Sequence, residues 1–501
     1  MEFVDSIYDN IHGYIGLTEL EQKIEQLRIF KRLKYIKQLG LASWIFPGAE
    51  HTRYTHSLGV MYIVDEMAKS LGIKSDKKRQ KIRLAGLLHD IGHYPLSHSV
   101  EEAYKNYSSA LDDNFILQIN KEDISSNNKY NKTQNNRTLK GNFDKKEQIM
   151  KQLDKDILLG IIMEPANNKY HHENMSARII KNSNHIKREI LADDRFNEED
   201  IADICDIITG NLVDNSQNKK YLEVMVQLMH SELDADRIDY LLRDAISSGT
   251  SYGKIEAETI IRNLKRVKNP EFDIDIVGIK RKGINSADQF LVNRFFAYSQ
   301  VIFHKHVAIL KEMVQRVAEY FISKGIFPDV LDWIGENKID NRYYEFTDNY
   351  FMKKLVKKNR EKIKDDIINN IIDNLVCGRA LELIDEPGNP MCFSVSYNKW
   401  GEAKKKKIQV EREYRRKCED DIYVKRENYL TKHVKIRDFR RLYKEYEKDL
   451  EQELEQLEKH RLLNGLAYIE GDKSKLLVDN EMSMLGELCR HQKLYLNGYE
   501  F

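Results

Sequence analysis

Residues that break helices are scarce in this chain, which has 7 prolines and 24 glycines among 501 residues. Proline removes a backbone hydrogen-bond donor and glycine lowers helix stability, so a chain that largely avoids both can remain helical over long stretches. Apolar residues also recur at helical spacing, and the expected helices cover 18–45, about 57–71, about 76–92, 147–164, 172–250 and about 286–322. We therefore predict an all-α fold of mainly helical architecture.

Two segments depart from this helical pattern. Segment 270–284 alternates apolar and polar residues, which predicts one or two short strands. Residues 120–146 are rich in Asn, Lys and Ser and poor in apolar residues, so we predict a mobile insertion there. The fold class is therefore all-α with a few short strands.

The C-terminal third of the chain has a different composition. Residues 400–461 are dominated by Lys, Glu, Arg and Tyr, and Leu450, Leu454 and Leu457 form one apolar stripe. This pattern predicts a long exposed helix or a helical hairpin. The length and the 41% hydrophobic content favour two or more substructures. We expect a core over 1–340, followed by a helical, charged C-terminal region over 341–501.

Charge and cysteine usage limit the classes of partner. The formal net charge is +1 although 32% of residues are charged, which predicts neither a nucleic-acid nor a membrane partner. Lys404–Lys407 could touch nucleic acid, but acidic residues interleave soon after, which favours a solvated helix face. The five cysteines are scattered without a CxxC pair, and the N-terminus lacks a signal-peptide pattern. No apolar run approaches the ~20 residues of a membrane span, so we expect a cytoplasmic protein.

Histidines and carboxylates gather in four short motifs, which are His51–His56, His89–His98, Tyr170–Glu173 and Glu232–Asp244. In the second motif an apolar helix ends in imidazoles and one carboxylate. Burying such groups costs free energy of folding unless the groups are paired or bind a metal. His89 and His93 are four residues apart, so we expect them on one helix face.

Two imidazoles and two carboxylates from these motifs would make a mixed nitrogen and oxygen metal site. They are His56, His89, Asp90 and Asp236. Such ligands suit Mn, Fe, Zn, Co or Mg, and the ligand types alone do not choose among these divalent metals. A single His–Asp pair is usually structural. The order His, His-Asp, Asp, with further histidines close by, favours a metal site.

The longer strings around these residues resemble a known family. They are IHGYI (11–15), RLKYIKQLG (32–40), FPGAEHTRYTHSLGV (46–60), LAGLLHDIGHYPLSH (84–98) and DADRIDYLLRD (234–244). Together they resemble the HD-domain deoxynucleoside triphosphate triphosphohydrolases, including the sterile-alpha-motif/HD-domain enzyme of animals and its bacterial relatives. The similarity covers about residues 5–320, with an insertion at 104–168. It implies a helical HD-domain fold, and it implies His56, His89, Asp90 and Asp236 as the metal ligands.

The resemblance also implies roles for four further residues. His93 and His172 would position water and phosphate, although His171 could take the place of His172. His98 would be the general acid that protonates the leaving 5′ oxygen, and Glu101 would orient it. A histidine suits this role because its unperturbed pKa is about 6.5.

For the substrate, the resemblance implies a set of binding residues, which are Gln38, Leu39, Arg53, Arg237, Tyr240, Asp244 and Arg294. Arginines would hold the triphosphate, whose roughly four negative charges need cationic partners. Gln38 and Asp244 would bind the sugar 3′-hydroxyl, while Leu39 would crowd the 2′ position.

The sequence departs from the family in two places. Ile302 stands where the family commonly has Tyr, which weakens the expectation of deoxy-over-ribo selectivity. Gln26, Lys31 and Lys34 replace the residues that bind an activating guanine nucleotide in the animal enzyme.

The implied reaction is metal-dependent hydrolysis of a dNTP to a deoxynucleoside and inorganic triphosphate. One alternative is an HD phosphohydrolase that acts on another nucleotide or on nucleic-acid ends. Another alternative is a nucleotide-sensing binding module without catalysis, against which the intact metal set argues. The resemblance further implies a homo-oligomer, a dimer or a tetramer, and it leaves a regulatory nucleotide open.

Overall fold

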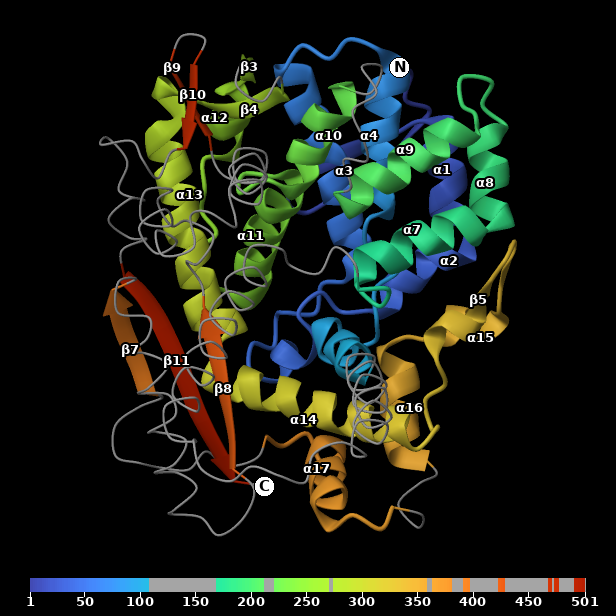
Figure 1. Cartoon of the computed structure of the whole chain (residues 1–501), viewed down its shortest axis with the longest axis vertical. Coiled ribbons are helices and arrows are strands. Elements are labelled where there is room, and N and C mark those ends of the chain that lie inside the picture. The colour runs from blue at the N-terminus through green and yellow to red at the C-terminus, as the bar shows by residue number, and fades with distance from the viewer. Residues whose placement is uncertain are drawn as a thin grey trace, which may run out of the picture.

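Helix α3 (Arg53–Ser70) is buried over most of its surface, so other elements cover it on nearly every side. In this computed structural model the described residues are 1–107, 168–210, 220–269, 274–357, 363–380, 391–396, 422–428, 467–470, 473–476 and 491–500. Helices α4 (Asp76–Leu88) and α11 (Ala235–Ser248) contact α3 directly. Figure 1 shows this group in the upper half of the molecule, with α9 (Glu198–Thr209) and α10 (Lys220–His230) around it.

The remaining helices surround this group or follow it in the chain. They are α1 (Glu19–Gln26), α2 (Arg28–Lys31), α7 (His172–Asn182), α8 (Asn184–Leu191), α12 (Ala257–Arg262), α13 (Ile284–Ala297), α14 (Lys305–Ser323), α15 (Asn341–Glu345), α16 (Asp348–Lys357) and α17 (Asp366–Val376). Residues 98–107 are also helical. Short 3₁₀ helices occur at Arg32–Tyr35, Gly40–Trp44, Arg281–Gly283 and Val330–Trp333. The predicted mainly helical fold is confirmed.

Within the described residues, the strands are short and lie in four small sheets. They are β1 (Asp5–Asp9), β2 (Gly13–Leu17), β3 (Leu264–Asn269), β4 (Ile274–Lys280), β5 (Ile334–Gly335), β6 (Lys338–Ile339), β7 (Met391–Ser396), β8 (Ile422–Asn428), β9 (Ala467–Glu470), β10 (Lys473–Leu476) and β11 (His491–Glu500). The sheet orders are β1-β2, β10-β9-β4-β3, β7-β11-β8 and β5-β6. The strand predicted within 270–284 is β4, and β3 precedes it as its antiparallel neighbour.

Strand β9 joins the C-terminal part of the chain to the sheet of the core. It runs parallel to β4, with Gly278 opposite Ala467. A side chain at Gly278 would bring a Cβ within 2.6 Å of the Ala467 carbonyl oxygen, so glycine permits this approach. The sheet therefore combines strands from both sides of position 340.

The helix predicted over 18–45 is broken. It ends at Leu27, whose backbone is extended with φ −64° and ψ 137°, and only short helical turns follow. Gly40 has φ +56°, a conformation that favours glycine. The apolar residues of this stretch are buried as expected, yet they reach the core from successive turns. Helical spacing of apolar residues alone does not reveal such breaks.

Two other predicted helices also differ from the structure. The helix predicted over 76–92 ends at Leu88, well before Pro95, so proline does not stop it. The helix predicted over 286–322 is interrupted by a π-helical turn at Tyr298–Ile302 and restarts at Lys305. An extended residue, His304 with ψ 132°, separates the two parts.

The prediction of a helical C-terminal region is correct only in part. Helices α15, α16 and α17 follow residue 340, but the described residues beyond 390 form strands. Strand β8 lies within 400–461, where a long exposed helix was expected, so that expectation is wrong at 422–428. The insertion at 120–146, the helix at 147–164 and the leucine stripe at Leu450–Leu457 lie outside the described residues. Among the helices described, none is both long and apolar enough to cross a membrane.

Candidate active site

The four residues expected to bind metal lie together where three helices meet. His56 lies in the first turns of α3, His89 and Asp90 directly follow α4, and Asp236 lies in the first turn of α11. His56 Nε2 is 2.8 Å from Asp236 Oδ1, and His89 Nε2 is 3.4 Å from Asp90 Oδ1. The two imidazole rings lie 5.2 Å apart. The ligand atoms of His56, His89 and Asp236 fall within 4.8 Å of one another, a spacing that one ion can bridge.

Hydrogen bonds orient both imidazoles for metal binding. His56 Nδ1 lies 2.8 Å from Asp239 Oδ2, and His89 Nδ1 lies 2.8 Å from the Gly86 carbonyl oxygen. Each Nδ1 therefore donates a hydrogen bond, so Nε2 is the atom that can bind a metal once it carries no proton. Both Nε2 atoms are buried and face carboxylates, with His56 Nε2 near Asp236 and His89 Nε2 near Asp90. Buried nitrogen atoms that face carboxylates fit a divalent metal ion, which would take the place of a proton.

The charges around His56 also favour a cation. Burial alone would lower the pKa of His56, but the hydrogen bonds and negative charges of Asp236 and Asp239 raise it to about 10. Burial acts against the charge of Asp90, while Arg53 and the neighbouring histidines hold the pKa of its carboxyl well below the usual range. The carboxyls of Asp90 and Asp236 are thus both ionised. A positive charge between them is strongly stabilised.

Asp239 is a buried residue of this site that lies within the motif Glu232–Asp244 but to which the sequence analysis assigned no role. Besides His56, its carboxylate contacts His12 Nε2 at 2.6 Å and receives two hydrogen bonds from Arg243. Arg243 in turn donates to Asp9 at the end of β1. A network of this kind fixes the ring of a metal ligand and its tautomer. Only its position three residues after Asp236, within one helix, could have suggested it.

We expect Asp239→Asn to weaken metal binding without removing a ligand. An amide carries no charge and can present an N–H toward His56 Nδ1, so the ring loses both its orientation and part of its basicity. Loss of such a partner typically costs about 10- to 100-fold in metal affinity. Titration of the metal-free chain with Mn²⁺, followed by calorimetry, measures this. An unchanged affinity would show that Asp239 serves folding alone.

His89 and His93 do not share one helix face, contrary to the sequence-based expectation. Because α4 ends at Leu88, His93 lies in the turns that follow, where its N–H donates to the Asp90 carbonyl oxygen. His89 faces the metal ligands, whereas His93 belongs to a second group of imidazoles. The spacing of four residues predicts a shared face only while the helix continues.

This second group consists of three histidines around Glu101. The rings of His93 and His172 stack with centroids 4.3 Å apart, and the ring of His98 lies 4.9 Å from that of His93. Glu101, which is fully buried, contacts His98 Nδ1 at 2.9 Å and His172 Nδ1 at 3.2 Å. One carboxylate therefore orients two imidazoles, whereas the sequence suggested only His98 as its partner.

The protonation states of this group suit hydrogen bonding to an anion. Burial lowers the pKa of His172, but the charge and hydrogen bond of Glu101 raise it to about 9, so the ring is positive at neutral pH. Burial, Arg53 and His172 lower the pKa of His93 well below its usual value, which keeps His93 neutral. His93 Nδ1 accepts a hydrogen bond from Tyr94 N, so its proton lies on Nε2. That Nε2 is buried and lacks a partner.

The four residues His93, His98, Glu101 and His172 lie close enough together to hold a second ion. The hydrogen bonds argue for another use, because both Nδ1 atoms bound to Glu101 are donors rather than ligands. His171 lies farther out, with Nε2 4.0 Å from Glu101 and Nδ1 3.5 Å from Glu173. Of the two adjacent histidines, His172 therefore faces His93.

The substrate residues inferred from the resemblance are only partly assembled around these two groups. Arg53 Nη1 binds Asp90 Oδ2 at 2.6 Å, so its guanidinium lies beside the metal ligands. Tyr240 and Asp244 follow Asp236 at intervals of four residues on α11 and thus share its face. Asp244 Oδ1 lies 2.7 Å from His51 Nε2, a partner that the sequence did not suggest.

Gln38 and Leu39 lie in the loop before the 3₁₀ helix Gly40–Trp44. The carbonyl oxygen of Gln38 accepts from Ser97 Oγ at 3.3 Å, which places this loop against the turn that precedes His98. The side-chain Oε1 of Gln38 is buried and has no hydrogen-bond partner among the described residues. A buried polar atom of this kind is suited to bind a ligand.

Arg237 and Arg294 are tied to acidic residues of the same region. Arg237 forms an ion pair with Asp234, and Arg294 forms one with Glu232. The guanidinium of Arg294 also lies 5.8 Å from the ring of Tyr298. Tyr298 begins the π-helical turn that ends at Ile302, so an aromatic ring does lie beside Arg294, although Ile302 replaces the family's tyrosine.

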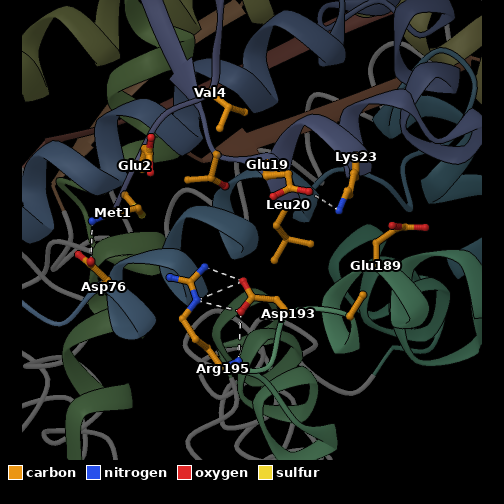
Figure 2. Close-up of a pocket in the computed structure, with 12 residues that line it drawn as sticks. Met1, Glu2, Val4, Glu19, Leu20, Lys23, Asp76, Glu189, Asp193 and Arg195 are labelled. Carbon is orange, nitrogen blue, oxygen red and sulfur yellow. Dashed lines mark hydrogen bonds and ion pairs between the residues drawn. The ribbon is translucent and has the colours of Figure 1, made fainter.

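A separate cavity of about 520 Å³ lies near the N-terminus and contains none of the candidate residues. Figure 2 shows that its charged groups mostly neutralise one another, with Arg195 bound to Asp193 and Lys23 bound to Glu19. The cavity therefore carries no argument about the reaction.

Comparisons with known proteins agree with this architecture. Residues 53–130 match the family model of the HD domain. The chain is 28% identical over 358 residues to the uncharacterized protein MJ1154 of Methanocaldococcus jannaschii, which covers 71% of this chain and 58% of that protein. The chain thus spans little more than half the length of this relative.

Two further comparisons concern smaller or more distant likenesses. Over 98 residues the chain is 45% identical to the deoxynucleoside triphosphate triphosphohydrolase SAMHD1 of Homo sapiens, which covers 18% of this chain and 16% of that protein. The fold resembles that of a phosphohydrolase from Bacteroides thetaiotaomicron with a TM-score of 0.56 at 19% identity, covering 99% of this chain and 100% of that chain. This second likeness shows the fold alone.

Proposed function

The chain carries an HD domain, and on this basis we propose that it is a metal-dependent phosphohydrolase that cleaves a dNTP to a deoxynucleoside and inorganic triphosphate. One observation carries the proposal: a single short stretch of chain, His89 to Glu101, supplies His89 and Asp90 to the group around His56 and supplies His93, His98 and Glu101 to the second group. The local identity to SAMHD1, which acts on deoxynucleoside triphosphates by its name, supports the substrate.

His56, His89, Asp90 and Asp236 would hold the metal. When bound, a divalent ion stabilises charge on phosphate oxygens and lowers the pKa of water. Arg53 would add a second positive charge beside it, because its guanidinium already lies 2.6 Å from Asp90. The identity of the metal stays open.

The histidines around Glu101 would act on the phosphate and on the leaving group. His93 has an unpartnered Nε2–H, and His172 is positive at neutral pH, so both can donate hydrogen bonds to phosphate oxygens. His98 would transfer its Nε2 proton to the 5′ oxygen while Nδ1 stays bound to Glu101. Water would attack the α-phosphorus, and the bond that breaks lies between this phosphorus and the 5′ oxygen. The water oxygen stays on the released triphosphate, and the proton from His98 stays on the deoxynucleoside.

The remaining substrate contacts follow from the positions of the other residues. Arg237 and Arg294 would exchange their acidic partners for the triphosphate, whose charge is larger. The face of α11 that carries Tyr240 and Asp244, together with Gln38 and Leu39, would bind the sugar. A homo-oligomer and a regulatory nucleotide belong to the same proposal.

A second candidate is an HD phosphohydrolase that acts on another nucleotide or on a nucleic-acid end. The observation that favours it is Ile302, which removes a family tyrosine from the sugar region. This candidate uses the same metal ligands and histidines, so only the products distinguish it from the first.

A substrate panel tests the proposal. The purified chain is incubated with Mn²⁺ or Mg²⁺ and with dNTPs, NTPs, cyclic nucleotides and short DNA, and the products are separated by ion-exchange chromatography. We expect dNTPs to give a deoxynucleoside and inorganic triphosphate. Pyrophosphate and a deoxynucleoside monophosphate would instead place the cleavage elsewhere, and hydrolysis of DNA ends alone would favour the second candidate. His89→Ala serves as the control against contaminating phosphatases.

A further inference from the structure

Asp348, the first residue of α16, binds two loops of the candidate active site at once. Its Oδ2 accepts a hydrogen bond from Lys37 N at 2.9 Å, and its Oδ1 accepts one from Leu96 N at 2.7 Å. The first loop carries Gln38 and the second leads directly into His98. One carboxylate from beyond residue 340 therefore joins the proposed sugar-binding loop to the loop of the proposed proton donor.

The turn that receives this hydrogen bond is strained. Leu96 and Ser97 have φ values of 52° and 57°, which side chains larger than glycine rarely adopt. Such a turn persists only when neighbouring groups hold it. Besides the bond to Asp348, Ser97 Oγ donates to the Lys37 carbonyl oxygen at 2.9 Å and accepts from Arg53 Nε at 3.0 Å. His98 comes next in the chain, so its placement depends on these bonds.

Arg32 ties the same C-terminal segment to the start of this loop. Its guanidinium donates to the carbonyl oxygens of His93 and of Phe346, each at 2.6 Å, and to that of Ile91 at 3.1 Å. Arg32 is buried, and its guanidinium also lies 4.5 Å from the ring of Tyr343 and donates to the Tyr343 hydroxyl at 3.2 Å. Residues 343–348 therefore contact this loop at Leu96 directly, through Asp348, and at His93 indirectly, through Arg32.

Neighbouring aspartates act differently from Asp348. Asp340 and Asp365 accept from backbone amides of their own helices, at Arg342 N and Ile368 N. The two oxygens of Asp348 bind the amides of Leu96 and Lys37, which lie 252 and 311 residues away in the chain. Helix capping thus explains Asp340 and Asp365, but it does not explain Asp348.

We propose that Asp348 is a positioning residue, which fixes the proton donor His98 relative to the sugar-binding loop. This inference rests on the proposed function, because it assigns Asp348 a part in the same reaction. The hydrogen bonds of Asp348 go to the two loop amides, although the charge of Arg53 also acts on its carboxyl. Its loss should slow proton donation to the leaving oxygen and leave metal binding unchanged.

Asp348→Asn tests the inference, with Asp340→Asn as the matched control on the same segment. Asparagine keeps the shape but turns an N–H toward one of the two loop amides. Hydrogen–deuterium exchange should rise in peptides that contain Lys37 and Leu96. With dNTP as substrate, kcat should fall by about 10- to 100-fold, as misplacement of a catalytic group by about 1 Å does, while KM changes little.

A substrate with a good leaving group separates positioning from general destabilisation. Bis(4-nitrophenyl) phosphate releases an anion that needs no proton, so Asp348→Asn should retain most of its rate on this ester. Metal content and melting temperature should match those of Asp340→Asn. If Asp348→Asn does not fold, Ser97→Ala, which removes another bond between the same loops, is measured in the same way.

The outcomes that would overturn the inference are distinct. An unchanged kcat on dNTP, or equal losses on both substrates together with a lower melting temperature, would leave Asp348 with a structural role only. The inference would also be refuted if the wild-type chain hydrolyses dNTPs but Asp348→Asn shows no faster hydrogen–deuterium exchange in these peptides. A wild-type chain inactive on every dNTP would instead refute the proposed function, and the positioning role with it.

Discussion

Asp90→Asn and His89→Ala are each expected to abolish hydrolysis and to remove most of the bound metal. Both residues supply atoms that face the other ligands, with His89 Nε2 3.4 Å from Asp90 Oδ1 and 3.8 Å from Asp236 Oδ1. The nearest other carboxylate, that of Asp239, contacts His56 at Nδ1 rather than at Nε2, so it does not face the proposed metal position. Metal analysis after gel filtration, together with the dNTP assay, measures both effects.

The two variants differ in their expected effect on stability. Asp90 forms a buried ion pair with Arg53, so its neutralisation leaves a buried guanidinium without its charge partner, which can cost about 3–5 kcal/mol. His89→Ala leaves that pair intact and should fold more stably. His230→Ala is the matched control, because His230 is bonded to the Ile207 carbonyl oxygen and is not a member of the group. Full metal occupancy in both site variants would refute the ligand assignment.

His98→Ala is expected to cut turnover by about 10²- to 10⁴-fold, the usual contribution of a general acid. The side chain of His98 is 61% exposed and is held through Nδ1 by Glu101, so Nε2 is free to reach a ligand. Metal content should not change, because His98 belongs to the other group of histidines. Single-turnover kinetics at saturating dNTP measure the effect on the chemical step.

The pH dependence gives an independent check on this role. Partial burial lowers the pKa of His98 below the usual value of a histidine, although Glu101 opposes this shift. A general acid must be protonated, so wild-type turnover should fall as the pH rises through that lowered pKa. His98→Ala should lose that dependence. A separate loss is expected near pH 9, where His172, whose pKa is raised to about 9, gives up the positive charge that binds phosphate. The alternative role of His98 is to begin the helix at 98–107. Near-normal turnover with an unchanged pH profile would favour that alternative.

Much of the candidate site was predictable because its residues are marked by short local motifs. His56, His89, Asp90 and Asp236 were identified as a set before any geometry was known, and the structure brings their side chains together. The helical class was predictable for a similar reason, since composition and apolar spacing act within a few turns of chain. Roles assigned through the resemblance, such as those of Arg237 and Arg294, stay predictions.

Other features depend on contacts between residues far apart in sequence, which a local pattern does not contain. The breaks at Leu27 and at Tyr298–Ile302 interrupt stretches whose apolar spacing is continuous. Strand β9 is four residues long, and its pairing with β4, about 190 residues earlier in the chain, is a contact that no local pattern contains. Local propensity therefore misjudged these segments.

The sequence by itself determined the helical class, and short local motifs were enough to predict the candidate metal ligands, because composition, apolar spacing and motifs all depend on nearby residues. Tertiary structure alone decided that Asp239 orients His56, that Glu101 serves two histidines, and that Asp348 joins two loops. The physical reason is that the identity of an aspartate or glutamate in the sequence does not specify which partner its carboxylate will have. Whether it caps a helix, pairs with a cation or orients an imidazole depends on which donors the folded chain brings within about 3 Å.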